Sequence, residues 1–114
     1  MASDGGQRSE RAARNEAVFR RVNERLEEVN AAFGSMLDTG DFVCECADIA
    51  CVERIELPIP QYEALRSVAT HFIVKPGHEL AVEERVVERH DSYLVVEKVG
   101  EAGERAADLD PRTD

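Results

Sequence analysis

The chain has 114 residues, of which 43% are hydrophobic, 33% are charged and only 5% are aromatic. This length suits a single domain with a modest aliphatic core, which a bound metal ion would help to stabilise. The formal net charge of −10 argues against nucleic acid and anionic membrane surfaces as partners, because both attract clustered positive charge. No apolar run is long enough to cross a membrane, and residues 1–6 lack the apolar core of a signal peptide, so we expect a cytoplasmic protein.

The N-terminal third of the chain is dominated by a helical pattern. Residues 1–8 are small and polar, and we expect them to be disordered. Residues 9–33 predict a long amphipathic helix, because apolar side chains recur every three or four positions. This stripe consists of Val18, Val22, Leu26, Val29 and Phe33. We expect it to lie across a sheet; the alternative is a coiled-coil-like seam with a second copy or another protein, although two heptads are fewer than such seams usually sustain.

The middle of the chain carries short strand patterns separated by turn residues. Residues 42–46 and 52–57 predict an antiparallel pair of strands, and a short helix follows over residues 61–68, with Pro60 in its first turn. Residues 71–74 predict another strand.

A second hairpin pattern and a polar segment complete the chain. Residues 82–89 and 92–99 predict a β-hairpin, with a helix over residues 82–89 as the competing interpretation. Residues 101–114 are acidic and alanine-rich, and we expect a flexible tail. Residues 9–100 would then form one α+β domain: a long helix against a small, mostly antiparallel sheet, with one short second helix.

All three cysteines fall within eight positions, which is the most chemically specific feature of the sequence. Cys44 and Cys46 would share one face of a strand, and Cys51 would return after a short turn. Three thiolates and one histidine form a standard structural zinc set, so we predict that the domain is held together by Zn²⁺. Two alternatives stay open: the thiols are merely buried, or Cys46 and Cys51 form a redox pair that leaves Cys44 unexplained.

The fourth ligand is predicted to be His78. It lies in a Pro-Gly loop whose backbone can bring the imidazole to a distant site. His71 begins a strand and His90 lies at a predicted hairpin tip, so both are weaker candidates. Asp48 is close to the cysteines but suits a turn. A site built from Cys44, Cys46, Cys51 and His78 would connect the two halves of the domain.

The chain also resembles a family of uncharacterised small proteins of actinobacterial type with a CxCx4C…PGH pattern. The matching segments are residues 14–20, 42–46, 53–57, 62–66, 76–79 and 93–98, together with Cys51. The resemblance implies that the three cysteines and His78 belong to the family pattern. It implies no activity.

No catalytic motif stands out. Three sulfur ligands would weaken zinc as a Lewis acid, and Glu45 and Glu79 are expected to be solvated or to neighbour the ligands. We therefore predict that the protein is not an enzyme. The first hypothesis is a structural-zinc module that contacts another protein or a second copy through its N-terminal helix. The second is a thiol-based redox or metal sensor whose fold loosens when the zinc-bound cysteines are oxidised.

Overall fold

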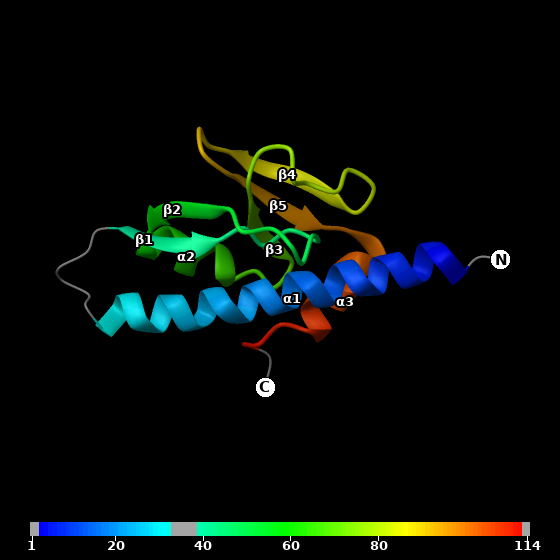
Figure 1. Ribbon diagram of the computed structural model, residues 1–114, viewed down its shortest axis with the longest axis horizontal. Helices are drawn as coiled ribbons and strands as arrows, with labels where there is room; N and C mark the ends of the chain where they lie inside the picture. The colour runs from blue at the N-terminus through cyan, green and yellow to red at the C-terminus, as the bar shows by residue number, and fades with distance from the viewer. Residues whose placement is uncertain (1–2, 33–38, 113–114) are drawn as a thin grey trace.

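A computed structural model describes residues 3–32 and 39–112. Within these residues the chain forms three helices and two small antiparallel sheets, which confirms the predicted α+β class. Helix α1 (Ser3–Ala32) runs along the molecule, whose extents are 54 × 33 × 24 Å, and both sheets lie on one side of it (Figure 1). Residues 3–8, expected to be disordered, belong to this helix.

The first sheet contains the predicted early strand pair. Strand β1 (Thr39–Val43) pairs antiparallel with β2 (Arg54–Pro58), and Phe42 lies opposite Ile55. Strand β1 begins earlier than predicted and ends at Val43, so the cysteines follow the strand instead of lying within it.

The second sheet contains the predicted C-terminal hairpin. Strand β5 (Leu94–Lys98) lies between β3 (His71–Val74) and β4 (Glu84–Arg89), and both pairings are antiparallel. The alternative of a helix over residues 82–89 is wrong. A register shift between Val86 and Glu88 marks an irregularity in β4.

Helix α2 (Ile59–Arg66) packs against β2, β3 and α1. It carries a proline in its first turn, as predicted, and buries Tyr62 and Leu65. The Tyr62 ring stacks on Phe42, with 4.2 Å between ring centroids. The fully buried apolar side chains come from both sheets and α2, so they form one core: Phe42, Ile55, Leu57, Tyr62, Ile73, Val74, Val95 and Val96. No helix in the described part of the chain is long and apolar enough to span a membrane.

The buried face of α1 is not the predicted one. Among the stripe residues, Val18, Val22 and Val29 are 44%, 41% and 49% exposed, and Leu26 alone packs against the core. Phe33 lies outside the described residues. The buried face instead includes the polar residues Glu16, Arg20 and Asn23, together with Ala12, Ala17 and Phe19.

Each buried polar residue of α1 has a partner far away in sequence. Glu16 lies 2.6 Å from the Lys98 ammonium, and Arg20 donates to the Ala69 and His71 carbonyl oxygens while stacking over the Phe72 ring. Burial of charged and polar groups is tolerated where such partners replace water. These partners therefore rotate α1 away from the orientation that its apolar residues alone would favour.

The segment after Gly100 is not a flexible tail. Residues Gly100–Asp108 form helix α3, which contacts α1 and β5 and buries Ala102, Gly103 and Ala106. A Cβ on Gly103 would lie 2.9 Å from the Lys98 carbonyl oxygen, so glycine allows the helix to pack this closely.

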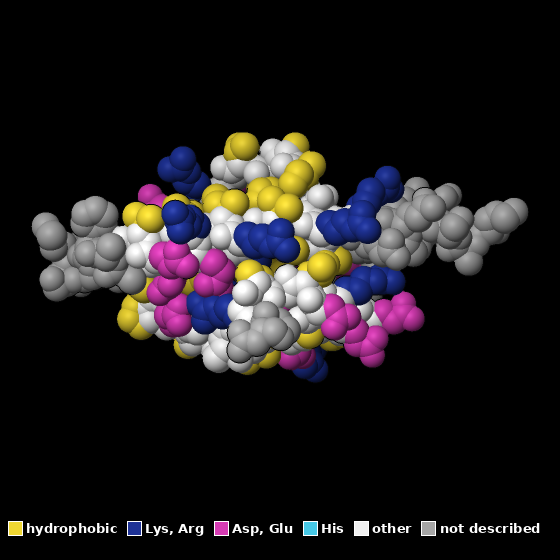
Figure 2. Space-filling view, turned by 90° about the horizontal axis from the view of Figure 1, so that it is seen from below, with side chains coloured by type: hydrophobic (Ala, Val, Ile, Leu, Met, Phe, Trp, Pro, Cys, Tyr) yellow, Lys and Arg dark blue, Asp and Glu magenta, His cyan; other side chains and the backbone are white. Residues whose placement is uncertain are grey.

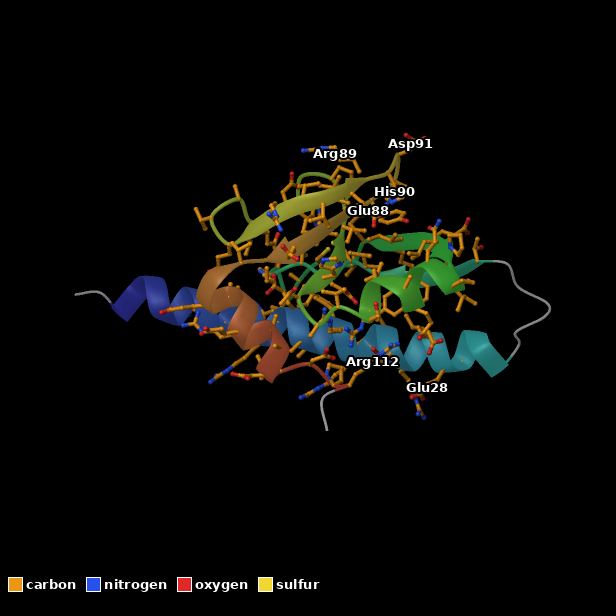
Figure 3. The ribbon with its side chains drawn as sticks, turned by 180° about the vertical axis from the view of Figure 1, so that it is seen from behind. Glu28, Glu88, Arg89, His90, Asp91 and Arg112 are labelled. Atoms are coloured by element: carbon orange, nitrogen blue, oxygen red, sulfur yellow. The ribbon has the colours of Figure 1, made fainter. Side chains whose placement is uncertain are left out.

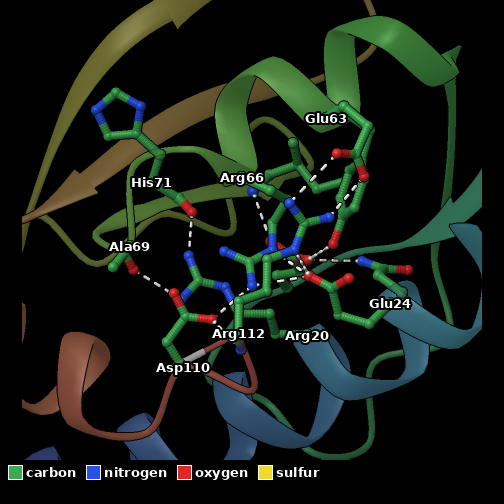
Figure 4. A network of polar contacts seen from close by, with 12 residues as sticks. Arg20, Glu24, Glu63, Arg66, Ala69, His71, Asp110 and Arg112 are labelled. Carbon is green, nitrogen blue, oxygen red and sulfur yellow. Dashed lines mark hydrogen bonds and ion pairs between the residues drawn. The ribbon is translucent and has the colours of Figure 1, made fainter. Parts of the chain in front are cut away.

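The chain beyond α3 is held by ion pairs (Figure 4). Asp110 accepts from Arg66 at 2.6 Å, and Arg112 donates to Glu24 at 2.5 Å and to Glu63 at 2.6 Å. The C-terminal residues thus join α1 to α2. The acidic, alanine-rich composition of this segment could not reveal the role, because its partners lie at least 44 residues away in sequence.

Candidate metal centre

The four predicted ligands lie together in the structure. One potential ligand atom from each of Cys44, Cys46, Cys51 and His78 lies within 4.8 Å of all the others. His78 Nδ1 is 3.6 Å from the Cys44 sulfur and 3.6 Å from the Cys51 sulfur. Cys44 and Cys46 are buried, whereas Cys51 and His78 are half-buried. The group could hold a metal ion between the two sheets.

A turn brings Cys51 back towards the first two cysteines. The Cys44 amide continues the pairing of β1 by donating to the Glu53 carbonyl oxygen at 3.0 Å. The Asp48 carboxylate accepts from the Ala50 amide at 2.9 Å, and its carbonyl oxygen accepts from the Cys51 amide at 2.9 Å. Asp48 therefore orders the turn, as predicted, and is not part of the cluster.

A second turn places His78. The His78 amide donates to the Lys75 carbonyl oxygen at 2.9 Å, and Gly77 has a φ of +93°, which side-chain-bearing residues rarely adopt. The half-buried Glu79 side chain accepts from the Gly77 amide at 2.7 Å and so stabilises the same turn. The Lys75 amide donates to the Cys44 sulfur at 3.2 Å, which directly joins the two loops of the cluster.

Glu45 connects the cluster to the interior. Its side chain is fully buried, contrary to a solvated position. One carboxylate oxygen accepts from Asn23 at 2.8 Å and from Tyr62 at 3.0 Å, and the other accepts from the Ile73 amide at 3.1 Å. These donors come from α1, α2 and β3, so the residue between two predicted ligands contacts three elements.

Asn23 holds the end of β1 in the same network. Its amide accepts from the Val43 N–H at 2.7 Å and donates to the Val43 carbonyl oxygen at 2.8 Å. The side chain thus replaces a neighbouring strand at this position. Sequence reasoning missed Asn23, because a polar residue inside a charged helix gives no sign of burial. For Glu45, the position between two cysteines was the sequence feature that indicated a role beside the cluster.

Burial shapes the electrostatics of the cluster. It raises the pKa of the Cys44 thiol, although the hydrogen bond from the Lys75 amide acts in the opposite direction. Burial also raises the pKa of the Cys46 thiol. Neighbouring thiolates would repel one another, and a cation bound among them would offset both costs.

The other two histidines do not join the cluster. His71 Nε2 lies 3.3 Å from Glu97, its cross-strand neighbour on β5. His90 stacks on Tyr93 with 4.3 Å between ring centroids, and its Nε2 lies 2.9 Å from Glu88. The side chains of both histidines therefore contact residues in or beside the second sheet.

An open cavity of about 410 Å³ adjoins the cluster. It is lined by Cys46, Ala47, Asp48, Gly77, His78 and Leu80. One side of the cluster is therefore accessible to small molecules.

Comparisons of the chain with protein-family models, curated proteins and solved structures give no match. The resemblance noted from the sequence stays a prediction.

Proposed function

We propose that this protein is a small cytoplasmic module in which a structural zinc ion stabilises an α+β fold, and which contacts another protein through α1. The observation that carries the proposal is the convergence of three sulfurs and one imidazole nitrogen within 4.8 Å. They come from two loops that are far apart in sequence, so one ion would tie together both sheets.

Two sulfur–nitrogen distances in the cluster suit zinc. Bond lengths of about 2.3 Å to sulfur and about 2.0–2.1 Å to nitrogen in a tetrahedron place each sulfur roughly 3.6 Å from the nitrogen. The Cys44 and Cys51 sulfurs both lie 3.6 Å from His78 Nδ1. Soft thiolates disfavour magnesium and calcium, and a tetrahedral set of sulfur and nitrogen donors favours zinc.

A structural role suits the ligand set better than catalysis. Four protein ligands complete the tetrahedron and leave no position for water, whereas catalytic zinc keeps one open. The nearest buried carboxylate, Glu45, already accepts three hydrogen bonds. It is therefore a poor candidate for a general base. The proposed role includes no catalytic step.

Charge and thiol chemistry support the proposed compartment and partner classes. Free cysteines persist as zinc ligands in the reducing cytoplasm. A net charge of −10 disfavours nucleic acid and anionic membranes as partners. The exposed valines of α1 offer a surface for a protein partner instead.

Metal content tests the zinc proposal. We expect one zinc per chain in protein purified without added metal, and loss of that metal in Cys44→Ser and His78→Ala. His71→Ala and His90→Ala are matched controls that should keep full zinc. Full zinc in His78→Ala would exclude His78 as the fourth ligand. A folded parent protein without metal would contradict the proposal as a whole.

A redox or metal sensor is the second candidate, favoured by the cavity beside Cys46 and the partial exposure of Cys51. Zinc-bound thiolates that an oxidant can reach are oxidisable. Titration with hydrogen peroxide while zinc release is monitored separates the two candidates. Release at low peroxide, with a reversible loss of helix signal, supports the sensor; retention of zinc supports the structural module.

A further inference from the structure

The face of α1 that points away from the sheets combines positive charge with apolar surface. At about 100° per residue, seven exposed side chains fall within one arc roughly 100° wide. We call this arc the Arg–Val face; it consists of Arg11, Arg14, Val18, Arg21, Val22, Arg25 and Val29. Figure 2 shows Lys and Arg side chains in a row across this side of the molecule, with hydrophobic side chains between and beside them.

This concentration of positive charge contrasts with the rest of an acidic chain. The face holds four of the 14 basic residues, and none of its seven members is acidic. Two α1 glutamates turn inward: Glu16 pairs with Lys98, and Glu24 pairs with Arg66 and Arg112. At the margin, Glu28 lies 3.2 Å from Arg25.

Three of the four arginines have no acidic partner among the side chains that the structure describes. In the part of the chain that the structure describes, no ion pair involves Arg11, Arg14 or Arg21. All three guanidinium groups are exposed, so they can accept an external carboxylate as a partner.

The apolar side of the Arg–Val face continues into a groove between α1 and β1. This groove has a volume of about 270 Å³, and Val22 belongs to both surfaces. Its walls are Val22, Leu26, Asp41, Phe42, Val43 and Arg54. An apolar strip thus lies directly beside a row of guanidinium groups.

We propose that the Arg–Val face and this groove bind an acidic amphipathic segment of another protein. Its apolar side chains would cover Val18, Val22 and the groove, and its carboxylates would pair with Arg11, Arg14 and Arg21. Charge-assisted pairs between guanidinium and carboxylate groups give such contacts their orientation. This inference rests on the proposed function as an interaction module, and it names the class of partner.

Other occupants fit the surface less well. A second copy in a two-fold interface would set the same patch against itself, so arginines would face arginines. Nucleic acid has no aliphatic side chains to fill the groove, so it would satisfy only the arginine half of the surface. An acidic segment with apolar residues satisfies both halves of the surface.

A matched pair of synthetic peptides tests the proposal on the zinc-loaded chain of 114 residues. The probe has about 21 residues, with Leu at the core positions of three heptads and Glu at the flanking positions. The control peptide carries Lys in place of every Glu. By fluorescence anisotropy, we expect the Glu peptide to bind and the Lys peptide to bind at least about ten-fold more weakly. Equal binding of both peptides, or binding of neither, would overturn the proposal.

Variants of the protein locate the binding surface. Arg21→Glu should weaken binding of the Glu peptide about ten-fold or more, and Val22→Ser should weaken it measurably. The controls are Arg89→Glu and Val82→Ser. Arg89 lies at the edge of the molecule opposite α1, whereas Glu28 marks the α1 side (Figure 3). Val82 is 91% exposed outside the groove. Unchanged binding by Arg21→Glu, with normal thermal unfolding of that variant, would overturn the assignment.

Further measurements distinguish other classes of partner and test the partner proposal independently of the zinc proposal. Stronger binding to a short DNA duplex or to phosphatidylglycerol vesicles than to the Glu peptide would overturn the partner class. Sedimentation as a dimer that Arg21→Glu disrupts would assign the face to a second copy. Zinc is measured in every sample. If the zinc-loaded chain does not bind the Glu peptide, only the proposed partner class is contradicted. If a metal-free chain binds the peptide through Arg21, only the zinc proposal is contradicted.

Discussion

Glu45 stands between two of the four cluster residues, and its carboxylate receives hydrogen bonds from α1, α2 and β3. A buried carboxylate with three donors is well satisfied, and its hydrogen bonds depend on both oxygens being acceptors. The residue therefore acts as a junction between the cysteine–histidine cluster and the core, without belonging to the cluster.

Glu45→Gln tests this junction with a nearly isosteric change. The new amide places N–H donors against at least one of the existing donors, so we expect the free energy of unfolding to fall by about 1–3 kcal/mol. Urea unfolding of zinc-loaded protein measures this change. Glu79→Gln is the matched control, because Glu79 is an accessible loop residue that accepts one exposed hydrogen bond, and it should change stability little. Equal unfolding midpoints for the two variants would contradict the role of Glu45.

At the scale of elements, α1 is joined to the second sheet by two carboxylates and one ammonium. The Lys98 ammonium lies 2.6 Å from Glu16 and 2.6 Å from Glu84, with Glu83 at 3.7 Å. Burial raises the pKa of Glu16 to about 8, although the nearby Lys98 acts to lower it. The neighbouring Glu84 carboxylate acts in the same direction as burial, so near neutral pH the folded state favours a proton on Glu16 that the same residue would lose in the unfolded chain.

This raised pKa predicts that stability falls with increasing pH. Because the folded state binds the extra proton, Glu16 contributes to the free energy of unfolding. This contribution is complete below the ordinary pKa of a glutamate and is lost as pH rises through about 8. Thermal unfolding of zinc-saturated protein between about pH 6 and 9 should show a falling midpoint. Glu16→Gln, which mimics the protonated form, should flatten this slope. An equal slope in the parent and the variant would show that another group is responsible.

The element scale also shows where sequence patterns stop being informative. The cysteine spacing and the Pro-Gly loop predicted the four clustered residues, because these signals are local. The inner face of α1 could not be predicted, since Arg20 and Asn23 are buried only because the Ala69 and Val43 backbones lie opposite them. Helix α3 escaped prediction for a similar reason: its packing depends on contacts that its own composition does not reveal.

At the scale of the whole molecule, the cluster lies where the two sheets meet. The Glu45 amide donates to the Ile73 carbonyl oxygen at 2.8 Å, and the Lys75 amide donates to the Cys44 sulfur at 3.2 Å. Both hydrogen bonds cross from the loop after β1 to β3 or the loop that follows it. A bound ion would hold these same segments together, so its removal should act first on the contact between the sheets.

Metal removal by a chelator therefore has a local signature. In hydrogen exchange at neutral pH, the amides of Glu45 and Lys75 should exchange about ten-fold faster or more after zinc is removed, equivalent to a loss of roughly 1.4 kcal/mol in opening free energy. The Val99 amide, which donates to the Glu83 carbonyl oxygen at 2.9 Å beside the second sheet, is the internal reference and should change little. The chelator should have no effect on Cys44→Ser, which already lacks the metal. Equal acceleration at Val99 would show that zinc supports the entire fold and not the junction between the sheets, while unchanged exchange at Glu45 and Lys75 would show that zinc does not hold the sheets together.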